Sequence, residues 1–235
     1  MPAPLRGLLV TGTDTGAGKT VLTASLVAAM AAAGEPVVAH KPVVTGLDDS
    51  TSASSTDAAS WPPDHELLGA VSGLDPAAVS PLRFGPAVSP HLAARLARTP
   101  IDPAALVAAA RAAGADGRTL VVEGVGGLLV PLSEDFSVRD LAVALGLPLV
   151  IAARPALGTI NHTLLTVEAA RAAGLTVAAV VLTPWPDQPQ ELELSNRETI
   201  AALGGVAVET LGFLSAPTVE SLALAGARLP WRAWL

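Results

Sequence analysis

The residues best suited to chemistry lie at the start of the chain, between Leu8 and Thr20. An apolar stretch leads there into the segment GTDTGAGKT, which ends with Lys19 and Thr20. Backbone N–H groups of such a turn, with the N-terminus of the helix that follows, attract polyphosphate oxygens. Lys19 is expected to reach the terminal phosphates and Thr20 to ligate Mg²⁺. The predicted nucleotide-binding residues are Gly12, Thr13, Asp14, Thr15, Gly16, Ala17, Gly18, Lys19, Thr20 and Val21.

This loop departs from the usual pattern GxxxxGK[ST] at one position. The glycine expected six residues before Lys19 is Thr13, and Gly12 stands one place earlier. A glycine-rich helix start with a solvated lysine is the alternative interpretation. The apolar strand before the loop and the alanine-rich helix after it are the context that the phosphate-binding motif requires, so we predict a phosphate site.

Two further charged residues come at the ends of apolar strands. Lys41 directly follows VVAH and precedes Pro42, and Glu123 directly follows TLVV. A second ammonium beside a phosphate loop would stabilise the charge that develops in phosphoryl transfer, and a carboxylate there would bind a metal ion. The alternatives are a solvated lysine and a surface acid or helix-dipole partner.

The loops after these strands supply the other candidates. Thr45 is a possible hydroxyl donor to a substrate or an ordinary loop threonine. Gly126 and Gly127, which follow Glu123, permit a close approach of the backbone to a ligand.

A magnesium site requires only a few protein oxygens, because phosphate oxygens complete the coordination. We predict Thr20, Asp57 and Glu123 as its ligands. Asp48 and Asp49 lie in the same polar loop as Asp57, and spacing alone does not choose among the three.

A second anion site is predicted at a helix start, from the free N–H groups and helix dipole there. Plain helix capping is the alternative. The residues of this second anion site are Gly158, Thr159, Ile160 and Asn161.

Two other kinds of site are not indicated by the sequence. The four histidines show no paired ligand spacing, which argues against zinc, and the absence of a GxSxG elbow argues against acyl hydrolysis.

Strands and helices alternate along the chain, which predicts an α/β fold with a doubly wound, mostly parallel sheet in a three-layer P-loop NTPase arrangement. The carboxyl ends of the strands would bring these residues to one crevice. The expected strands include residues 37–40, 119–123, 147–152 and 177–182, and the expected helices residues 19–33, 91–98, 103–113, 138–145, 162–173 and 191–203.

Composition limits the function classes. The 235 residues predict one domain over 1–235, with a Trp-bearing tail over about 224–235 that is either packed or loose. Hydrophobic residues make up 51% of the chain, and the net charge is −7 without a dense basic cluster, so nucleic acid is an unexpected partner. Without cysteine, signal peptide or long apolar run, a cytoplasmic protein that does not interact with membranes is expected.

Five segments taken together resemble the dethiobiotin synthetase family. They span residues 8 to about 183, and a generic phosphate-loop ATPase would share only the first. The segments are GTDTGAGKT, KPVVTG at 41–46, SPHLAA at 89–94, VVEGVGGLLVPL at 121–132 and LGTINHTLLT at 157–166.

The resemblance implies a homodimer that closes the ureido ring on 7,8-diaminononanoate, using CO₂, ATP or another nucleoside triphosphate, and Mg²⁺. It implies that Thr15, Lys19 and Lys41 hold phosphates and act in catalysis. Thr45 and the backbone of Gly126 and Gly127 would face the carbamate, while Thr20, Asp57 and Glu123 would hold the metal ion. The helix start at 158–161 would bind the substrate carboxylate across the dimer interface.

Relatives often carry Asn-Asp where this chain has Thr183 and Pro184, which we assign to the nucleotide site. The preferred base therefore stays open. The main alternative is a regulatory switch ATPase of the partition or septum-positioning type. Such proteins usually carry a second lysine early in the loop, whereas this chain has Asp14 there. A module that binds nucleotide without turnover is a third possibility.

Overall fold

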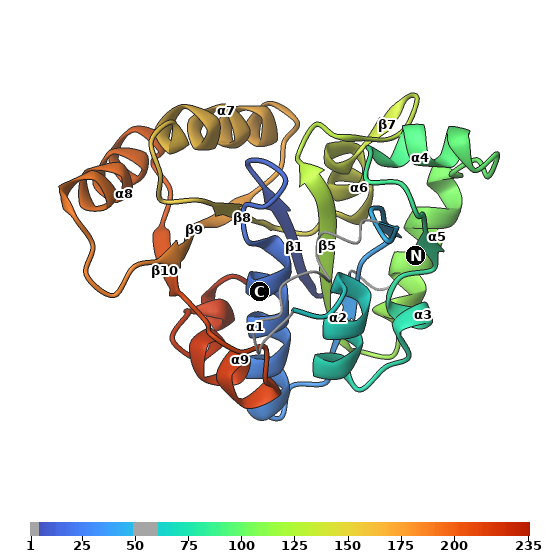
Figure 1. Ribbon diagram of the computed structural model, residues 1–235, viewed down its shortest axis with the longest axis horizontal. Coiled ribbons are helices and arrows are strands. Elements are labelled where there is room, and N and C mark those ends of the chain that lie inside the picture. Colours follow the sequence, from blue (N-terminus) through green and yellow to red (C-terminus); the bar gives the residue numbers. More distant parts are fainter. Residues whose placement is uncertain (1–4, 49–60) are drawn as a thin grey trace.

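A parallel six-stranded sheet forms the centre of the molecule (Figure 1). The computed structural model describes residues 5–48 and 61–235. The strand order is β10-β9-β8-β1-β5-β2, and every neighbouring pair is parallel, which confirms the predicted doubly wound α/β fold. The strands are β1 (Gly7–Gly12), β2 (Val37–His40), β5 (Thr119–Gly127), β8 (Leu149–Ala153), β9 (Val177–Trp185) and β10 (Val208–Gly212).

Helices cover both faces of this sheet, giving the predicted three layers. Buried side chains of α1, α2 and α9 join the core on one face, and those of α5, α6, α7 and α8 the core on the other. Because both faces are covered, the central strands β1 and β8 are buried along their whole length and are almost entirely apolar. The helices are α1 (Lys19–Ala32), α2 (Asp64–Ser72), α3 (Pro76–Val79), α4 (Pro90–Leu96), α5 (Pro103–Ala113), α6 (Val138–Leu145), α7 (Thr159–Ala172), α8 (Glu191–Gly204) and α9 (Val219–Gly226).

Several elements lie where no helix or strand was predicted. They are α2, α3, β10, α9 and two small strand pairs: β3 (Val43–Val44) with β4 (Leu82–Arg83), and β6 (Pro131–Ser133) with β7 (Phe136–Ser137). Helix α7 begins three residues before the predicted start at 162. Within the described ranges, no helix combines the length and the hydropathy that crossing a membrane requires.

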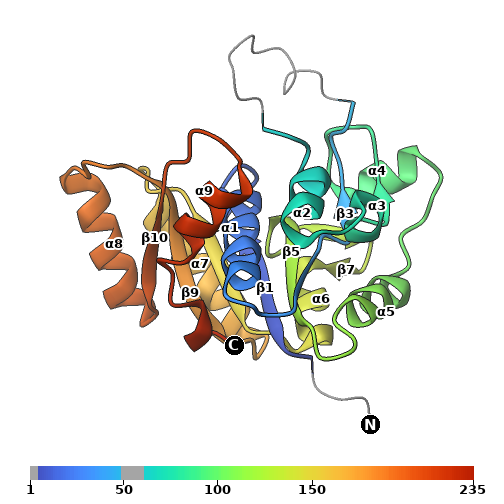
Figure 2. The same ribbon diagram turned by 90° about the horizontal axis from the view of Figure 1, so that it is seen from below.

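The end of the chain is packed rather than loose. Helix α9 continues to Gly226, so the tail begins later than the predicted residue 224. Figure 2 shows α9 beside α1, and the two helices are in contact. Trp231 and Trp234 are only 3% and 6% exposed, and they belong to the core on that face. This packing agrees with a single domain. The division of the chain into one domain stays a prediction from its length.

The topology brings the ends of three strands together. Strand β1 lies between β5 and β8, and the chain leaves it toward β2 on one side before returning to β8 on the other. Such a reversal of strand order creates a ligand-binding crevice at the carboxyl ends. In register, Val10 pairs with Glu123, and His40 pairs with Val122. Lys41, the next residue after His40, therefore comes level with Glu123.

The residue before Lys41, His40, is buried without polar partners. Its side chain is 2% exposed, and neither ring nitrogen has a hydrogen-bond partner in the described part of the chain. Burial lowers the pKa of His40 from 6.5 to about 4. A protonated imidazolium is therefore disfavoured in the folded state and acceptable in the unfolded state.

His40 should make the fold sensitive to acid. Because the folded pKa is the lower one, its effect is absent above about pH 6.5, and stability falls as the pH decreases toward 4. Between pH 7.5 and 5 we expect the free energy of unfolding to decrease by about 2 kcal/mol on this account. Urea unfolding at both pH values should show this decrease in wild type and a smaller decrease in His40→Leu. The exposed-site control His162→Gln should show the same decrease as wild type.

Candidate active site

The predicted phosphate loop lies between β1 and α1. Helix α1 begins at Lys19, and its N-cap Gly18 makes no side-chain cap, so the first N–H groups of the helix are available to a ligand. Gly16 and Gly18 have φ values of 71° and 86°, which glycine adopts readily. Lys19 folds back across the loop, and its Nζ donates to the Asp14 carbonyl oxygen at 3.0 Å. The loop thus has the form of an anion cradle.

Gly18 also fixes the distance between this loop and the end of β9. A Cβ added to Gly18 would lie 2.5 Å from Cγ2 of Thr183. Thr183 is therefore adjacent to the phosphate loop, as its assignment to the nucleotide site requires, while Pro184 is exposed beyond it.

Gly18→Ala is expected to weaken nucleotide binding by at least about 10-fold. An L-residue in the left-handed region costs about 1–2 kcal/mol, and the contact with Thr183 forces the loop or β9 to move as well. Calorimetric titration with a non-hydrolysable ATP analogue measures the loss. Gly34→Ala is the matched control, because Gly34 has φ 79° but open space around it. Equal affinities for wild type and Gly18→Ala would contradict the expectation.

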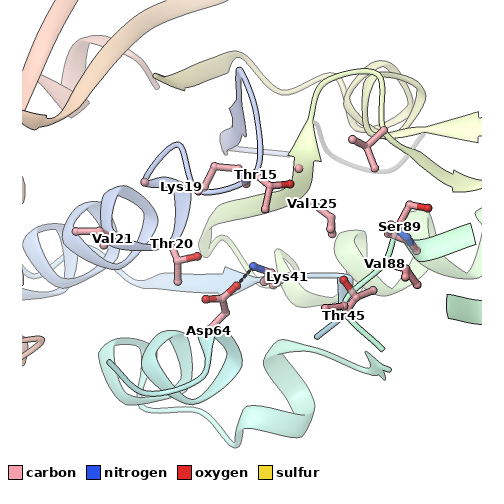
Figure 3. A pocket seen from close by; sticks show the side chains of 16 residues that line it. Thr15, Lys19, Thr20, Val21, Lys41, Thr45, Asp64, Val88, Ser89 and Val125 are labelled. Carbon is pink, nitrogen blue, oxygen red and sulfur yellow. Dashed lines mark hydrogen bonds and ion pairs between the residues drawn. The ribbon is translucent and has the colours of Figure 1, made fainter. Parts of the chain in front are cut away.

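Four polar side chains, from α1, α2, β5 and the residue that follows β2, meet at the floor of the site. Lys41 Nζ lies 2.6 Å from Glu123 Oε1 and also forms an ion pair with Asp64. Thr20 Oγ1 donates to the same Glu123 Oε1 at 2.8 Å. Figure 3 shows Lys41 reaching toward Asp64, with Thr20 beside them. The predicted proximity of Lys41, Glu123 and the phosphate loop is therefore present.

Burial and charge set the protonation of this cluster. Burial opposes the charge on Lys41, but the carboxylates of Glu123 and Asp64 outweigh it and raise the pKa of that amine. Burial also opposes ionisation of Asp64, yet Lys41 holds the pKa of that carboxyl below its usual value. For Lys19, burial dominates and lowers the pKa, and the nearby Lys41 adds to this effect. Lys41 is thus a fixed cation facing the loop.

A cavity of about 600 Å³ opens above these side chains. This volume suits a small-molecule site. Many predicted residues line it, and one wall, from residues 87 to 90, was not assigned a role from the sequence. The lining residues are Thr15, Gly16, Gly18, Lys19, Thr20, Val21, Lys41, Thr45, Asp64, Ala87, Val88, Ser89, Pro90, Val125, Gly126 and Val130.

Some predicted residues do not line this cavity. Glu123 is fully buried below it and accepts hydrogen bonds from Lys41 and Thr20. The start of α7 lies elsewhere, with Gly158 as N-cap at φ 91° and no side-chain cap. The other predicted residues outside the lining are Gly12, Thr13, Asp14, Ala17, Gly127, Thr159, Ile160, Asn161, Thr183 and Pro184.

Asp64 is the acidic residue that the sequence interpretation missed. Asp57 and Asp49 lie outside the described residues, so Asp57 as a metal ligand stays a prediction. Asp48 is described, and its carboxylate lies against Gly85 rather than among the cavity-lining residues. Asp64 is the first residue of α2 and lines the cavity. The segment PPDHE carried the signal, because an acidic residue after proline is typical of a helix start.

The donor set fits Mg²⁺. Thr20, Glu123 and Asp64 offer only oxygen atoms, and Glu123 Oε2 is buried with no hydrogen-bond partner in residues 5–48 and 61–235. The same ranges contain no group of three or more His, Cys, Asp or Glu side chains arranged for a metal ion. Two carboxylates and a hydroxyl would thus need phosphate oxygens to complete the coordination.

Comparisons with known proteins show the family of this chain. A protein-family model described as "AAA domain" matches residues 6–219. The ATP-dependent dethiobiotin synthetase BioD of Anaeromyxobacter sp. (strain Fw109-5) is 42% identical over 212 residues, covering 86% of this chain and 91% of the relative. The enzyme of the same name from Mycobacterium avium (strain 104) is 42% identical over 217 residues, covering 85% and 84%.

Among solved structures, the MinC:MinD cell division protein complex of Aquifex aeolicus contains a similar chain. The TM-score is 0.55 at 13% identity, with 94% of this chain and 86% of that chain covered. This likeness shows a shared fold and nothing about the switch-ATPase alternative. The relatives of similar sequence decide between the dethiobiotin synthetase and the switch ATPase, because their identity extends over most of this chain and of each relative. The chain belongs to the ATP-dependent dethiobiotin synthetase family.

Proposed function

We propose that this chain forms the ureido ring of dethiobiotin from 7,8-diaminononanoate, CO₂ and ATP or another nucleoside triphosphate. The observation that supports it best is the buried Lys41, which faces a phosphate loop across one cavity and is held there by Glu123 and Asp64. Family membership supplies the reaction, and the geometry supplies the charges that the reaction needs.

The proposed chemistry needs no covalent intermediate on the protein. A neutral amine of the substrate adds to CO₂ to form a carbamate, and a carbamate oxygen takes the γ-phosphoryl group. The neighbouring amine then attacks the carbonyl carbon and displaces phosphate. Anionic carbamate, phosphoryl and phosphate groups are close together at every stage, so catalysis depends mainly on positioning and electrostatic stabilisation.

The residues divide between the two ends of the cavity. Thr15, Lys19 and the loop N–H groups hold the phosphates, and Lys41 neutralises charge where the γ-phosphoryl group meets the carbamate. Thr45 lies on the side away from α1, the backbone of Gly126 lies beside Thr15, and both would face the carbamate together with the backbone of Gly127. Val88, Ser89 and Val125 close that side and limit access of water (Figure 3).

Thr20, Glu123 and Asp64 would hold Mg²⁺, which neutralises phosphate charge when it is bound. Asp57 remains a further candidate ligand. In the present arrangement Thr20 and Lys41 share Glu123 Oε1, which leaves Oε2 for the metal ion.

We further propose a homodimer. In it, the start of α7, residues 158–161, binds the carboxylate of the substrate that lies in the active site of the partner subunit. Large apolar side chains are exposed near that helix: Leu157, Leu129 and Leu165 are 88%, 58% and 56% exposed. Leu129 and Leu165 also line a separate cavity of about 490 Å³ between α7 and the end of β5. An exposed apolar patch of this kind is typical of a protein interface.

Leu165→Glu is therefore expected to shift the protein to a monomer and to lower turnover with it, because the charge would be buried in the interface. Light scattering after size exclusion reports the mass. Leu203→Glu is the control, since Leu203 is 70% exposed on α8 and should leave the dimer intact. A Leu165→Glu dimer with normal activity would exclude this interface.

Mass spectrometry of the ureido product, with several nucleoside triphosphates in parallel, tests the function. Product and phosphate should form together, and only when the diamine and bicarbonate are both present. Phosphate release without the diamine would instead favour the switch ATPase, and nucleotide binding without release would favour a simple binding module. The series also gives the base preference, which Thr183 and Pro184 leave open.

A further inference from the structure

A second cavity lies outside the catalytic one, between α4 and the β6–β7 hairpin. Its volume is about 650 Å³, and α4 and β6 are in contact. Figure 1 shows β7 beside α4. No residue is shared between its lining and that of the catalytic cavity. A volume of this size accommodates a small organic molecule.

The charges of this second cavity are separated by element. Arg95 and Arg98 come from α4 and the residues just after it, and Glu134 and Asp135 come from the hairpin turn. None of the four forms an ion pair with any residue of the described ranges. The cavity thus offers unpaired positive charge on one side and unpaired negative charge on the other.

Apolar side chains line the same cavity as the two charged groups. Leu132 is fully buried and Phe136 is half-buried, and both line the cavity. A carboxylate ligand would bind arginines strongly, since guanidinium groups pair with it in bidentate fashion. N–H donors at the other end would meet the acceptor-only carboxylates of Glu134 and Asp135.

We propose that this cavity is a second small-molecule site for an aliphatic carboxylate that carries N–H donors at its far end. Dethiobiotin, the product of the proposed function, belongs to this class: it has a carboxylate, an apolar chain and a ureido group. The assignment of dethiobiotin as occupant rests on that function, whereas the chemical class rests on the cavity alone.

A ligand in this second cavity would also restrain the walls of the catalytic cavity. Helix α4 begins at Pro90, which lines the catalytic cavity, and Arg95 of the same helix lines the second one. Likewise Val130 lines the first cavity and Leu132 the second. A ligand that joins α4 to the hairpin therefore restrains two walls of the catalytic cavity, and we expect the product to lower kcat without competing with nucleotide.

The test is a titration of the full-length protein with dethiobiotin, followed by backbone amide shifts in NMR spectra. Wild type should show shifts around residues 91–98 and 132–136 in addition to any at Thr45 and Gly126. Arg95→Ala with Arg98→Ala should weaken binding at the first set by at least about 10-fold and relieve product inhibition. Arg118→Ala with Arg228→Ala removes the same charge from a half-buried and an exposed position elsewhere and should change neither.

Two ligand variants test the assigned chemistry. The methyl ester of dethiobiotin lacks the carboxylate, and nonanoate lacks the N–H donors, so each should shift residues 91–98 and 132–136 more weakly. Shifts confined to the catalytic cavity, or equal affinity in the arginine variant, would overturn the proposal. Formation of the ureido ring is assayed separately. If the proposed function fails, the NMR titrations still show whether this cavity binds carboxylates that carry N–H donors.

Discussion

Lys41→Ala is expected to lower kcat by about 10²–10³-fold, the usual cost of removing one preorganised electrostatic contact to a transition state. The amine is buried, its pKa is raised by Glu123 and Asp64, and it faces the phosphate loop across the cavity. A water molecule in its place would carry no positive charge. Steady-state turnover with saturating diamine, bicarbonate and ATP measures the effect, and near-normal kcat would remove Lys41 from the site.

Loss of stability has to be separated from loss of catalysis in this variant. Removing Lys41 leaves Glu123 buried without its cation, and breaking a buried pair costs about 3–5 kcal/mol. Asp64 adds less, because its side chain is 42% exposed. The double variant Lys41→Met with Glu123→Gln removes both buried charges, so its thermal midpoint should recover toward wild type while kcat stays low. Recovery of both would show that Lys41 is only structural.

The sequence was informative where local patterns determine position. The phosphate loop, Lys41 and Glu123 each follow an apolar run, and parallel strands bring such ends to one edge of the sheet. The pairing of Val10 with Glu123 and of His40 with Val122 then places Lys41 and Glu123 in contact. Lys41 was predictable because the end of β2 and the topology together fix it. Glu123 lies inside β5, which continues to Gly127, and not at the strand end predicted for it; its place in the site follows from its pairing with Val10.

The rest of the site depends on contacts that no local pattern specifies. Asp64 reaches Lys41 because α2 packs against α1 and β2, and that packing is a tertiary property. The wall at residues 87–90 consists of a proline-rich turn and the first residue of α4, and its side chains face the cavity only because of the folding of the whole segment. SPHLAA contributes to the family resemblance, yet nothing in its spacing assigns Ser89 to the cavity.

The packing of the C-terminal tail also depends on contacts that no local pattern specifies. Trp231 and Trp234 come after Pro230 and stand three residues apart, but a segment this short predicts neither a packed nor a loose end. Burial against α1 and α9 decides the matter, since the apolar area of two tryptophans favours contact with the core.

The last prediction concerns the metal ion. Glu123→Gln keeps the volume of the side chain but replaces one carboxylate oxygen by an amide nitrogen, which does not bind Mg²⁺. Oε1 already accepts from Lys41 and Thr20, whereas Oε2 has no partner in the described part of the chain. In the variant the amide oxygen must serve either Lys41 and Thr20 or the metal ion, but not all three.

Outer-shell changes alone weaken metal binding by about 10–100-fold, so the apparent Mg²⁺ affinity of Glu123→Gln should decrease by at least about 10-fold. Activity measured against Mg²⁺ concentration at fixed ATP gives this shift, and high Mg²⁺ should restore part of the turnover. Glu198→Gln, an exposed acid on α8, is the control and should follow the wild-type curve. If the Glu123→Gln curve also overlays wild type, Glu123 orients Lys41 and does not bind the metal ion.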